Sequence, residues 1–600
     1  MLNIDEHQAV SKKGEKTPAY QPTPEEEKSL KIVKKLFSKA KKHRSKFDQK
    51  WGDYYRMFRG KQWKNERPSY RSSEVINLVF QTIQSFVPIM TDTKPRFEFL
   101  PEEPSDIVLS DILNEIIDWD WTRKNWLQVV TEVIYDAHFY GTGLSQLDFD
   151  PNGDAGLGTI SFESLDPLYC FPAPGAIDVN GKKSRYFITA VPMDVSIVKR
   201  LYPQKGKYVK PDTSGLEYLD KNVQSSIKYK SPSDNVVVTT ENPDNAASQD
   251  NTILYTLFLR DDEYEEVQET RQNPETGLPE PFFVQKLKYP KGRLIQVASN
   301  VLLKDIELPI EEGFFPIQKL INYIDPREFW GISEVEQIES PQTLFNKTLS
   351  FAMDVMNLMG NPIWVVDTSA NIDTDSLINR PGLVVEKNPG AEVRREMGVQ
   401  LQPFVMNLME SFKQWVDSVS GSQEVSRGIN PTGITAASAI SQLQQASQTR
   451  IRQKSRNLDA YLQDLGQQYL AMVFQYYTVP RIVRITNKQD PQITEYFKFS
   501  IEKEEDDNGE EKSVAKVRRY DENNMLGDEE IYKINGKFDV KVVTGSSLPF
   551  SKIEKENRLF NLYDRKLIDA EEVLKGLDYP NYEAILQRAQ AAQAAMMPPQ

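Results

Sequence analysis

The sequence predicts an α+β fold built from several packed units. Apolar residues recur at helical spacing in the first 140 residues and again after residue 333. Short apolar runs broken by turn residues occupy the stretch between them. At 600 residues, the chain also exceeds the usual length of one domain. Helices and strands therefore fall into separate regions instead of alternating, which is the pattern of an α+β protein.

The chain opens with a polar segment and a basic helix. Residues 1–24 contain three prolines and no apolar period, which predicts a disordered arm. From Leu30 to Phe58 apolar residues recur three or four positions apart, which predicts a helix that ends before Gly60. Lysines and arginines run through the same stretch, from Lys28 to Lys64. Such a run is typical of a nucleic-acid or membrane-surface patch, but a solvated helix face or a contact with an acidic neighbour is commoner.

Two further helices are expected, from Glu74 to Met90 and from Ser105 to Tyr140. The second contains the segment DWDW, Asp118 to Trp121, whose two carboxylates superficially resemble those of a glycosidase. Residues two apart on a helix point to different faces, so a structural role is the favoured interpretation.

A β-rich region follows, between Gly141 and Asp325. Its apolar runs are LSQLDF, GTISFESL, YFITAVPM, TILYTLFL, PFFVQKLKY and RLIQVASN. Their spacing and turn residues predict antiparallel strands. The stretch from Pro203 to Asp250 is rich in Ser, Asn, Asp and Lys, and it predicts a poorly ordered insertion.

The segment from Ser333 to residue 398 predicts a helix followed by a small β module. Ser333 with Glu336 forms a capping box, and Ser340 with Pro341 is expected to restart the helix, which continues to Gly360. The runs IWVVD and PGLVVEKNPGAEV after it are β-type, with Pro-Gly turns.

Two helices and a loop come next. The first begins near Pro403 and ends at Gly421, and a loop of Gly, Pro and polar residues follows it. Thr435 is expected to cap a helix from Ala436 to Tyr477, about 60 Å long at 1.5 Å per residue. Short strands, an acidic loop from Glu502 to Glu511 and a helical tail after Ser551 complete the chain.

Composition excludes several chemistries. The three histidines show no metal or triad spacing, and no Gly-Lys pair completes a P-loop. Asp373 and Asp375 lack the order of an EF-hand, so they are interpreted as solvated acids. We therefore expect no catalytic residue, no metal site and no cofactor.

Charge and location are also constrained. The net charge of −14 argues against tight, site-specific DNA binding, but it is compatible with DNA sliding past. The N-terminal residues lack the apolar core of a secretory signal, and the apolar stretch from Val75 to Met90 is interrupted by polar residues. We expect neither export nor a membrane span. A single cysteine, Cys170, suits assembly in a reducing cytoplasm.

Several local phrases resemble the portal proteins of tailed bacteriophages. FRGKQW (58–63) is similar to an early family signature, and PREFWGISEVEQIESPQTLFN (326–346) resembles the start of the first stem helix. SRGINPTGITAASAISQLQQASQTRIR (426–452) resembles the tunnel loop and the helix after it, and LPFSKIEKENRLFNLYDRKLIDAEEVLKGL (548–577) resembles the end of such chains. Together the phrases cover most of residues 50–590.

The resemblance implies a portal-type fold and assigns its parts by position. It places a wing at 25–332, with a flexible insertion at about 203–250, a first stem helix at 333–360 and a small α/β clip at 362–398. It places a second stem helix at 402–420, a tunnel loop at 421–437 and a long wing helix with a β extension at 438–550. The tail at 551–600 would form a helical crown.

Site residues follow from these assignments. The channel-facing loop would present Ser426, Arg427, Asn430, Thr432 and Thr435. The clip, the docking surface for a motor or adaptor, would use Ile363, Trp364, Val365, Val366, Leu383, Val384 and Val385. The stem helices would contribute Leu344, Met353, Met356, Phe412 and Trp415.

The resemblance also implies partners. Portal subunits form a ring, usually of twelve copies, at one capsid vertex of the virion. Such rings contact the large terminase subunit, the major capsid and scaffolding proteins, head-completion or tail adaptor proteins and, transiently, double-stranded DNA. The alternative is another head–tail connector or adaptor ring protein, although adaptors are normally much shorter. An enzyme is the third interpretation, and it would need a cluster of titratable groups in a pocket.

Overall fold

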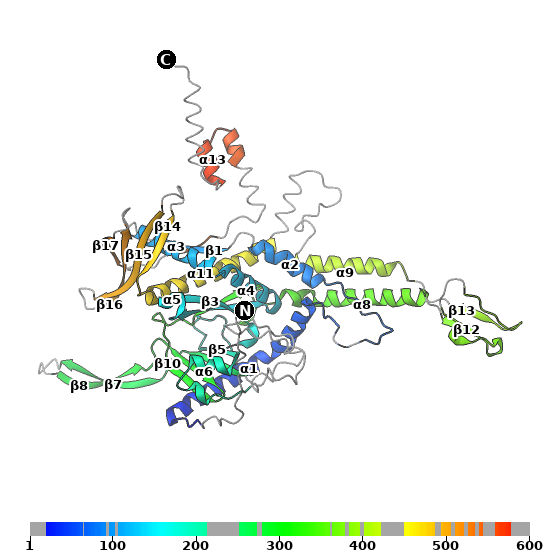
Figure 1. Ribbon diagram of the computed structural model, residues 1–600, viewed down its shortest axis with the longest axis horizontal. Coiled ribbons are helices and arrows are strands. Elements are labelled where there is room, and N and C mark those ends of the chain that lie inside the picture. The colour runs from blue at the N-terminus through cyan, green and yellow to red at the C-terminus, as the bar shows by residue number, and fades with distance from the viewer. Residues whose placement is uncertain are drawn as a thin grey trace, which may run out of the picture.

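The computed structural model describes an α+β body with a protruding pair of helices (Figure 1). The described residues are 20–63, 65, 67–91, 95–101, 106–212, 251–272, 279–360, 363–378, 383–396, 401–421, 449–486, 494–505, 511–520, 526–533, 539–543 and 559–577. Nearly all of the predicted arm, most of the predicted insertion and the predicted loop after Gly421 therefore lie outside them.

The described helices follow one another along the chain, and they include α5 and α6, which the sequence did not predict. They are α1 (Pro24–Phe58), α2 (Leu78–Thr91), α3 (Ile107–Arg123), α4 (Trp126–Tyr140), α5 (Gly153–Gly156), α6 (Val195–Leu201), α8 (Glu334–Gly360), α9 (Phe404–Ser420), α11 (Thr449–Tyr476) and α13 (Ala570–Gly576). Helix α1 begins with a complete capping box between Thr23 and Glu26, followed by Pro24 at its first position.

The strands form separate antiparallel sheets. A five-stranded sheet has the order β10 (Val301–Glu307), β9 (Arg293–Ala298), β6 (Asn251–Leu259), β5 (Tyr186–Asp194), β4 (Cys170–Pro172). A three-stranded sheet has the order β11 (Ile317–Ile321), β2 (Thr142–Asp150), β3 (Thr159–Leu165). A four-stranded sheet runs β14 (Arg481–Thr486), β15 (Thr494–Glu505), β16 (Glu511–Tyr520), β17 (Leu526–Lys533). Three pairs complete the set: β1 (Arg96–Leu100) with β18 (Asp539–Val543), β7 (Tyr264–Gln272) with β8 (Pro279–Leu287), and β12 (Ile363–Val366) with β13 (Val393–Glu396).

A large hydrophobic core joins the body, and a smaller cluster lies around α6 and neighbouring residues of β6, β9 and β10. Helix α1 lies against the five-stranded sheet, where the Phe37 ring meets Phe171 at 4.8 Å and Tyr255 at 4.9 Å between centroids. Beneath them, the buried Arg44 guanidinium donates to the backbone carbonyls of residues 167, 168 and 170 and lies over the Phe171 ring. These hydrogen bonds satisfy three buried carbonyl groups at the start of β4 and in the turn before it.

The segment just before α8 crosses the segment just after α4 at two glycines, Gly331 and Gly141. Gly141 adopts a left-handed conformation (φ +83°), and a Cβ there would lie 2.0 Å from the carbonyl oxygen of Gly331. A Cβ on Gly331 would lie 2.4 Å from the carbonyl oxygen of Gly141. The two backbones therefore touch directly, with no room for a side chain at either position.

Three predicted details are wrong. The expected helix from Ser105 to Tyr140 is two helices, because Asn125 adopts a left-handed conformation (φ 52°) between α3 and α4. That reversal brings Trp121 against Trp126, with ring centroids 5.8 Å apart. The helix expected to restart at Pro341 is continuous from Glu334 to Gly360. In the second β-type run of the predicted clip, residues 383–385 form no strand, and β12 pairs with residues 393–396 instead.

Candidate functional site

Helices α8 and α9 form a hairpin that extends from the body and ends in the β12–β13 ribbon (Figure 1). The chain runs outward along α8, turns through residues 363–396 at the tip, and returns along α9. Phe412 and Val416 of α9 are buried, as are Phe345 and Ala352 of α8. Apolar contact of this kind holds an antiparallel helix pair together.

The hairpin also exposes a second set of apolar side chains. Leu344, Phe351 and Leu358 follow one another at seven-residue intervals on α8 and are 42%, 55% and 57% exposed. Phe404, Leu408, Trp415 and Val419 recur on α9 at intervals of four, seven and four, and all are exposed. We call these seven residues the apolar seams. Heptad-spaced apolar positions are the pattern that packs one helix against another.

The ribbon at the tip pairs the apolar strand β12 with the mostly charged strand β13, and its residues are half-buried or exposed. In its register Ile363 lies opposite Glu396, and Trp364 lies opposite Arg395, whose guanidinium is 4.3 Å from the indole centroid. Ile363 is 67% exposed and Val384 is 84% exposed. Among the described residues no further strand pairs with either outer edge of the ribbon, so the ribbon can accept another strand.

We call the end of the hairpin nearest the body its root. A network of amide side chains holds this root against the start of α2 and the segment after α1. The Gln342 Oε1 atom accepts from the backbone N–H groups of Leu78 and Val79 at 2.9 and 3.2 Å, and so caps α2 from outside. Asn346 donates to Gln62, whose Nε2 atom donates to Asn77 Oδ1 at 3.1 Å. The segments FRGKQW and PQTLFN, nearly 300 residues apart in sequence, therefore meet in one network.

A buried ion pair lies deeper in the root. Lys454 of α11 donates to Glu334, the first residue of α8, at 2.6 Å, and both side chains are at most 1% exposed. The ammonium also lies 4.1 Å from the Phe86 centroid and 4.9 Å from that of Tyr323. His138 of α4 completes the cluster: its Nδ1–H donates to the Ile134 carbonyl at 2.7 Å, so its Nε2 accepts from Lys454 at 3.3 Å. We call Glu334, Lys454 and His138 the root triad.

Sequence spacing gives no signal for the root triad, because its members come from three helices. Burial first, and the Lys454 charge second, hold the pKa of His138 well below its usual value. The histidine is therefore a neutral acceptor that helps to solvate a buried ammonium. This arrangement joins α4, α8 and α11 at the point where the hairpin leaves the body.

Replacing His138 should change the pH dependence of stability. In the folded protein His138 stays neutral, whereas in the unfolded chain it gains a proton as the pH falls through about 6.5. The free energy of unfolding should therefore fall with decreasing pH, and His138 should contribute about 1 kcal/mol of that loss between pH 7 and 5.5. In His138→Gln, urea unfolding measured at pH 7 and 5.5 should no longer show this contribution to the loss of unfolding free energy. His43→Gln, at a half-exposed histidine, should follow the parent; equal losses in all three proteins would contradict the assignment.

The predicted site residues fall into three groups. Leu344, Met356 and Trp415 lie exposed on the hairpin, Met353 is half-buried, and Phe412 is buried with its ring 5.4 Å from that of Trp415. The predicted tip residues all lie at the end of the hairpin, half-buried or exposed. The five loop residues from Ser426 to Thr435 lie outside the described residues.

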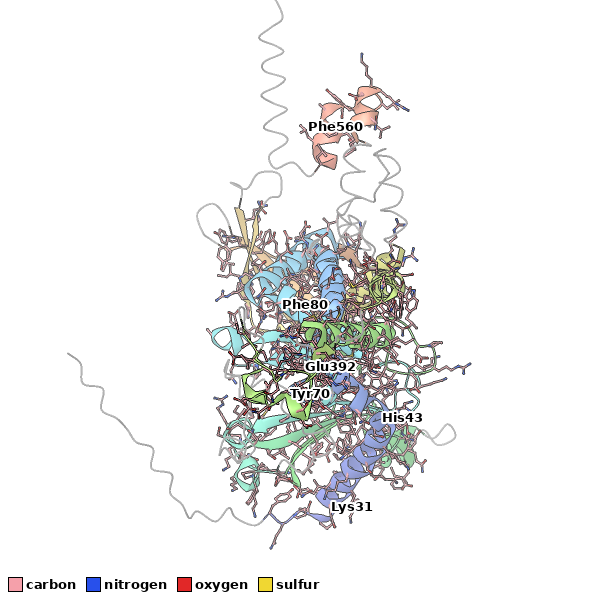
Figure 2. The ribbon with its side chains drawn as sticks, turned by 90° about the vertical axis from the view of Figure 1, so that its right-hand side faces the viewer. Lys31, His43, Tyr70, Phe80, Glu392 and Phe560 are labelled. Atoms are coloured by element: carbon pink, nitrogen blue, oxygen red, sulfur yellow. The ribbon has the colours of Figure 1, made fainter. Side chains whose placement is uncertain are left out.

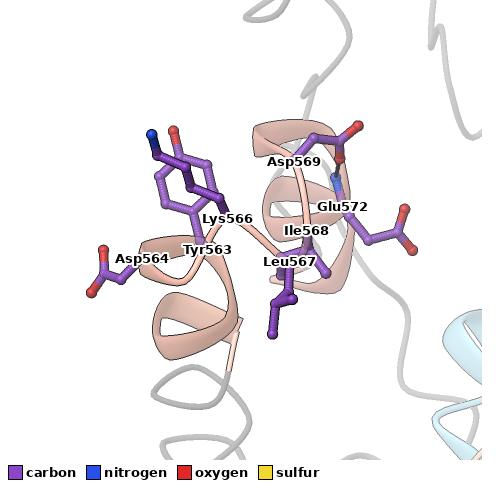
Figure 3. Close-up of a pocket in the computed structure, with 7 residues that line it drawn as sticks. All are labelled: Tyr563, Asp564, Lys566, Leu567, Ile568, Asp569 and Glu572. Carbon is purple, nitrogen blue, oxygen red and sulfur yellow. Dashed lines mark hydrogen bonds between the residues drawn. The ribbon is translucent and has the colours of Figure 1, made fainter.

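Within the described part of the chain, no group of three or more His, Cys, Asp or Glu side chains could hold a metal ion. A shallow pocket lies between the short helices near the C-terminus, lined by residues 563–572 (Figure 3). Asp564, Lys566 and Glu572 point away from one another there, so they do not converge on a ligand. No described helix is long and apolar enough to cross a membrane.

An α+β body with a protruding hairpin and exposed apolar seams is typical of a protein that binds other chains, because exposed apolar patches mark interaction surfaces. The family model of the phage P22-like portal proteins matches residues 34–600. The chain therefore belongs to the P22-like portal protein family of bacteriophages and is a structural component of the virion that serves viral DNA packaging. No curated protein matches the chain.

Proposed function

We propose that identical copies of this chain form a closed ring at one capsid vertex, and that double-stranded DNA enters and leaves the capsid through this ring. The observation that carries the proposal is the pair of exposed apolar seams on α8 and α9. A closed ring needs two different, complementary surfaces on each subunit. A helical hairpin with separate seams on its two helices supplies them.

The tip of the hairpin is proposed as the docking platform. Residues 363–396 are the part of the hairpin farthest from the body, and Ile363 and Val384 are exposed there (Figure 1). In a ring, every copy would present this tip on the same rim. The large terminase subunit during packaging, and head-completion or tail adaptor proteins afterwards, are the proposed partners.

The loop from Gly421 to residue 437 is proposed to face the channel. It follows α9, whose end is marked by Gly421 in a left-handed conformation (φ 75°). Ser426, Asn430, Thr432 and Thr435 are small and polar, and Arg427 supplies one cation. Weak polar contacts of this kind touch phosphates without holding them, as sliding requires.

Electron microscopy of the purified protein tests the ring, and a loop variant tests the channel. One chain is 68.9 kDa, so rings should appear as particles of several hundred kilodaltons with a central hole. Arg427→Ala, combined with a loop shortened by a few residues, should leave rings intact but alter DNA packaging or retention in filled heads. A monomer under all salt conditions would refute the ring, whereas unchanged packaging and retention would refute the channel-facing loop alone.

A further inference from the structure

Helix α1 carries a row of exposed lysines that the proposed channel does not use. Lys28, Lys31, Lys35, Lys39 and Lys42 recur every three or four residues, and all five are exposed. At 100° per residue they share one face of the helix, opposite the buried Val33, Ala40 and Arg44. We call them the lysine stripe. It is about 21 Å long at 1.5 Å per residue, and Lys31 lies at the outer edge of the molecule in Figure 2.

The stripe differs from the lysines that follow it on the same helix. Lys46 pairs with Glu328 at 2.5 Å and Lys50 with Glu336 at 3.6 Å, so the body neutralises both. Within the stripe, Lys31 pairs with Glu27 at 3.1 Å. Lys28, Lys35, Lys39 and Lys42 form no ion pair with any described residue.

This arrangement destabilises the isolated helix. Lysines three or four positions apart on a helix repel one another, each pair by a few tenths of a kcal/mol. The stripe contains four such neighbouring pairs in a protein whose net charge is −14. Glu27 offsets part of this repulsion at Lys31, and a polyanion bound along this face would remove the rest.

The side chains around the lysine stripe indicate which kind of polyanion would bind it. Protein interfaces have an apolar or aromatic centre that supplies most of the binding energy. No large hydrophobic side chain is exposed anywhere on α1. Duplex nucleic acid needs no such centre, because binding comes from cations that displace counterions from its phosphates. Lysines, which act as point charges, suit contacts that do not depend on sequence.

We propose that the lysine stripe binds the phosphate backbone of duplex DNA outside the channel. The stripe lies on the α+β body, toward the end of α1 that is farthest from α8 and α9 (Figure 1). Because the proposed ring is built through α8 and α9, DNA held on the stripe would make a contact separate from the proposed channel. With about five phosphate contacts, binding should weaken by about four to five powers of ten for each tenfold rise in salt.

A closed circular duplex of random sequence distinguishes binding at the lysine stripe from binding in the channel, because a closed circle cannot pass through a closed ring. Binding of the fluorescently labelled circle to the full-length protein should be measured by anisotropy across a salt series. In Lys35→Gln/Lys39→Gln/Lys42→Gln, the slope of log affinity against log salt should fall by about 2.7, at about 0.9 per lysine. Affinity at low salt should fall at least tenfold.

The control variant removes three lysines from another part of the surface. Lys182, Lys183 and Lys199 are exposed on other parts of the body, and their triple Gln variant should keep the parent slope. Electron microscopy of the same samples should show intact rings in all three proteins. Equal slopes in the stripe variant and the parent would overturn the proposal. Competition by poly-glutamate as effective as that by duplex DNA would overturn it too, and would point to an acidic protein partner.

Discussion

Placing one charge in either apolar seam should abolish ring assembly. Phe351 of α8 and Trp415 of α9 are more than half exposed in the single chain, so Phe351→Glu and Trp415→Glu should change the stability of the subunit by less than about 1 kcal/mol. In an assembled ring each side chain would be covered by a neighbour, and an unpaired buried carboxylate costs several kcal/mol at every contact. The fraction of protein in rings should fall more than tenfold.

Native mass spectrometry and electron microscopy give that fraction directly. Gln414→Glu is the matched control, because it adds the same charge at the exposed position beside Trp415 and should leave rings intact. Rings at parental yield in both seam variants would show that the seams are not the subunit contact. The proposed ring would then need another interface.

Breaking the buried ion pair should give the largest loss of stability. Lys454→Met leaves the Glu334 carboxylate buried without its cation, which typically costs about 3–5 kcal/mol. The double variant Lys454→Met/Glu334→Leu removes both charges and should recover most of that loss, because two apolar groups of similar volume need no solvation. Urea unfolding of the two single variants and the double variant measures the coupling.

A surface pair supplies the comparison. Lys46 and Glu328 approach as closely, at 2.5 Å, but Lys46 is half exposed, so Lys46→Met should cost less than about 1 kcal/mol. A Lys454→Met variant as stable as the parent would show that the buried pair does not stabilise the subunit.

The sequence predicts most of the helices and strands whose position depends on their own pattern of apolar residues. Helices α1, α8 and α9 and strands β2, β3, β5, β6, β8 and β9 fall on the expected periodic stretches. The break at Asn125 escaped prediction because it depends on the packing of Trp121 and Trp126. Pro341 does not restart α8, because Val335 and Ile338 before it and Phe345 after it are buried, and their packing outweighs the loss of one helical hydrogen bond.

The functional surfaces were predictable only in part. Heptad spacing of apolar residues is visible in sequence, but exposure is not, so Phe412 and Trp415 could not be separated into a buried and an exposed residue. Three of the chosen tip residues, Leu383, Val384 and Val385, have strand-like composition but lie beside no partner strand. The root triad depends on three helices meeting, and no local pattern encodes it.

The crossing of Gly141 and Gly331 has a consequence for the evolution of this chain. The two residues lie 190 positions apart, yet each occupies the space that any side chain on the other would need. No second substitution can compensate for a change at either, because the atom in the way is backbone. Both glycines should therefore be retained together as related sequences diverge, while the exposed residues around them change.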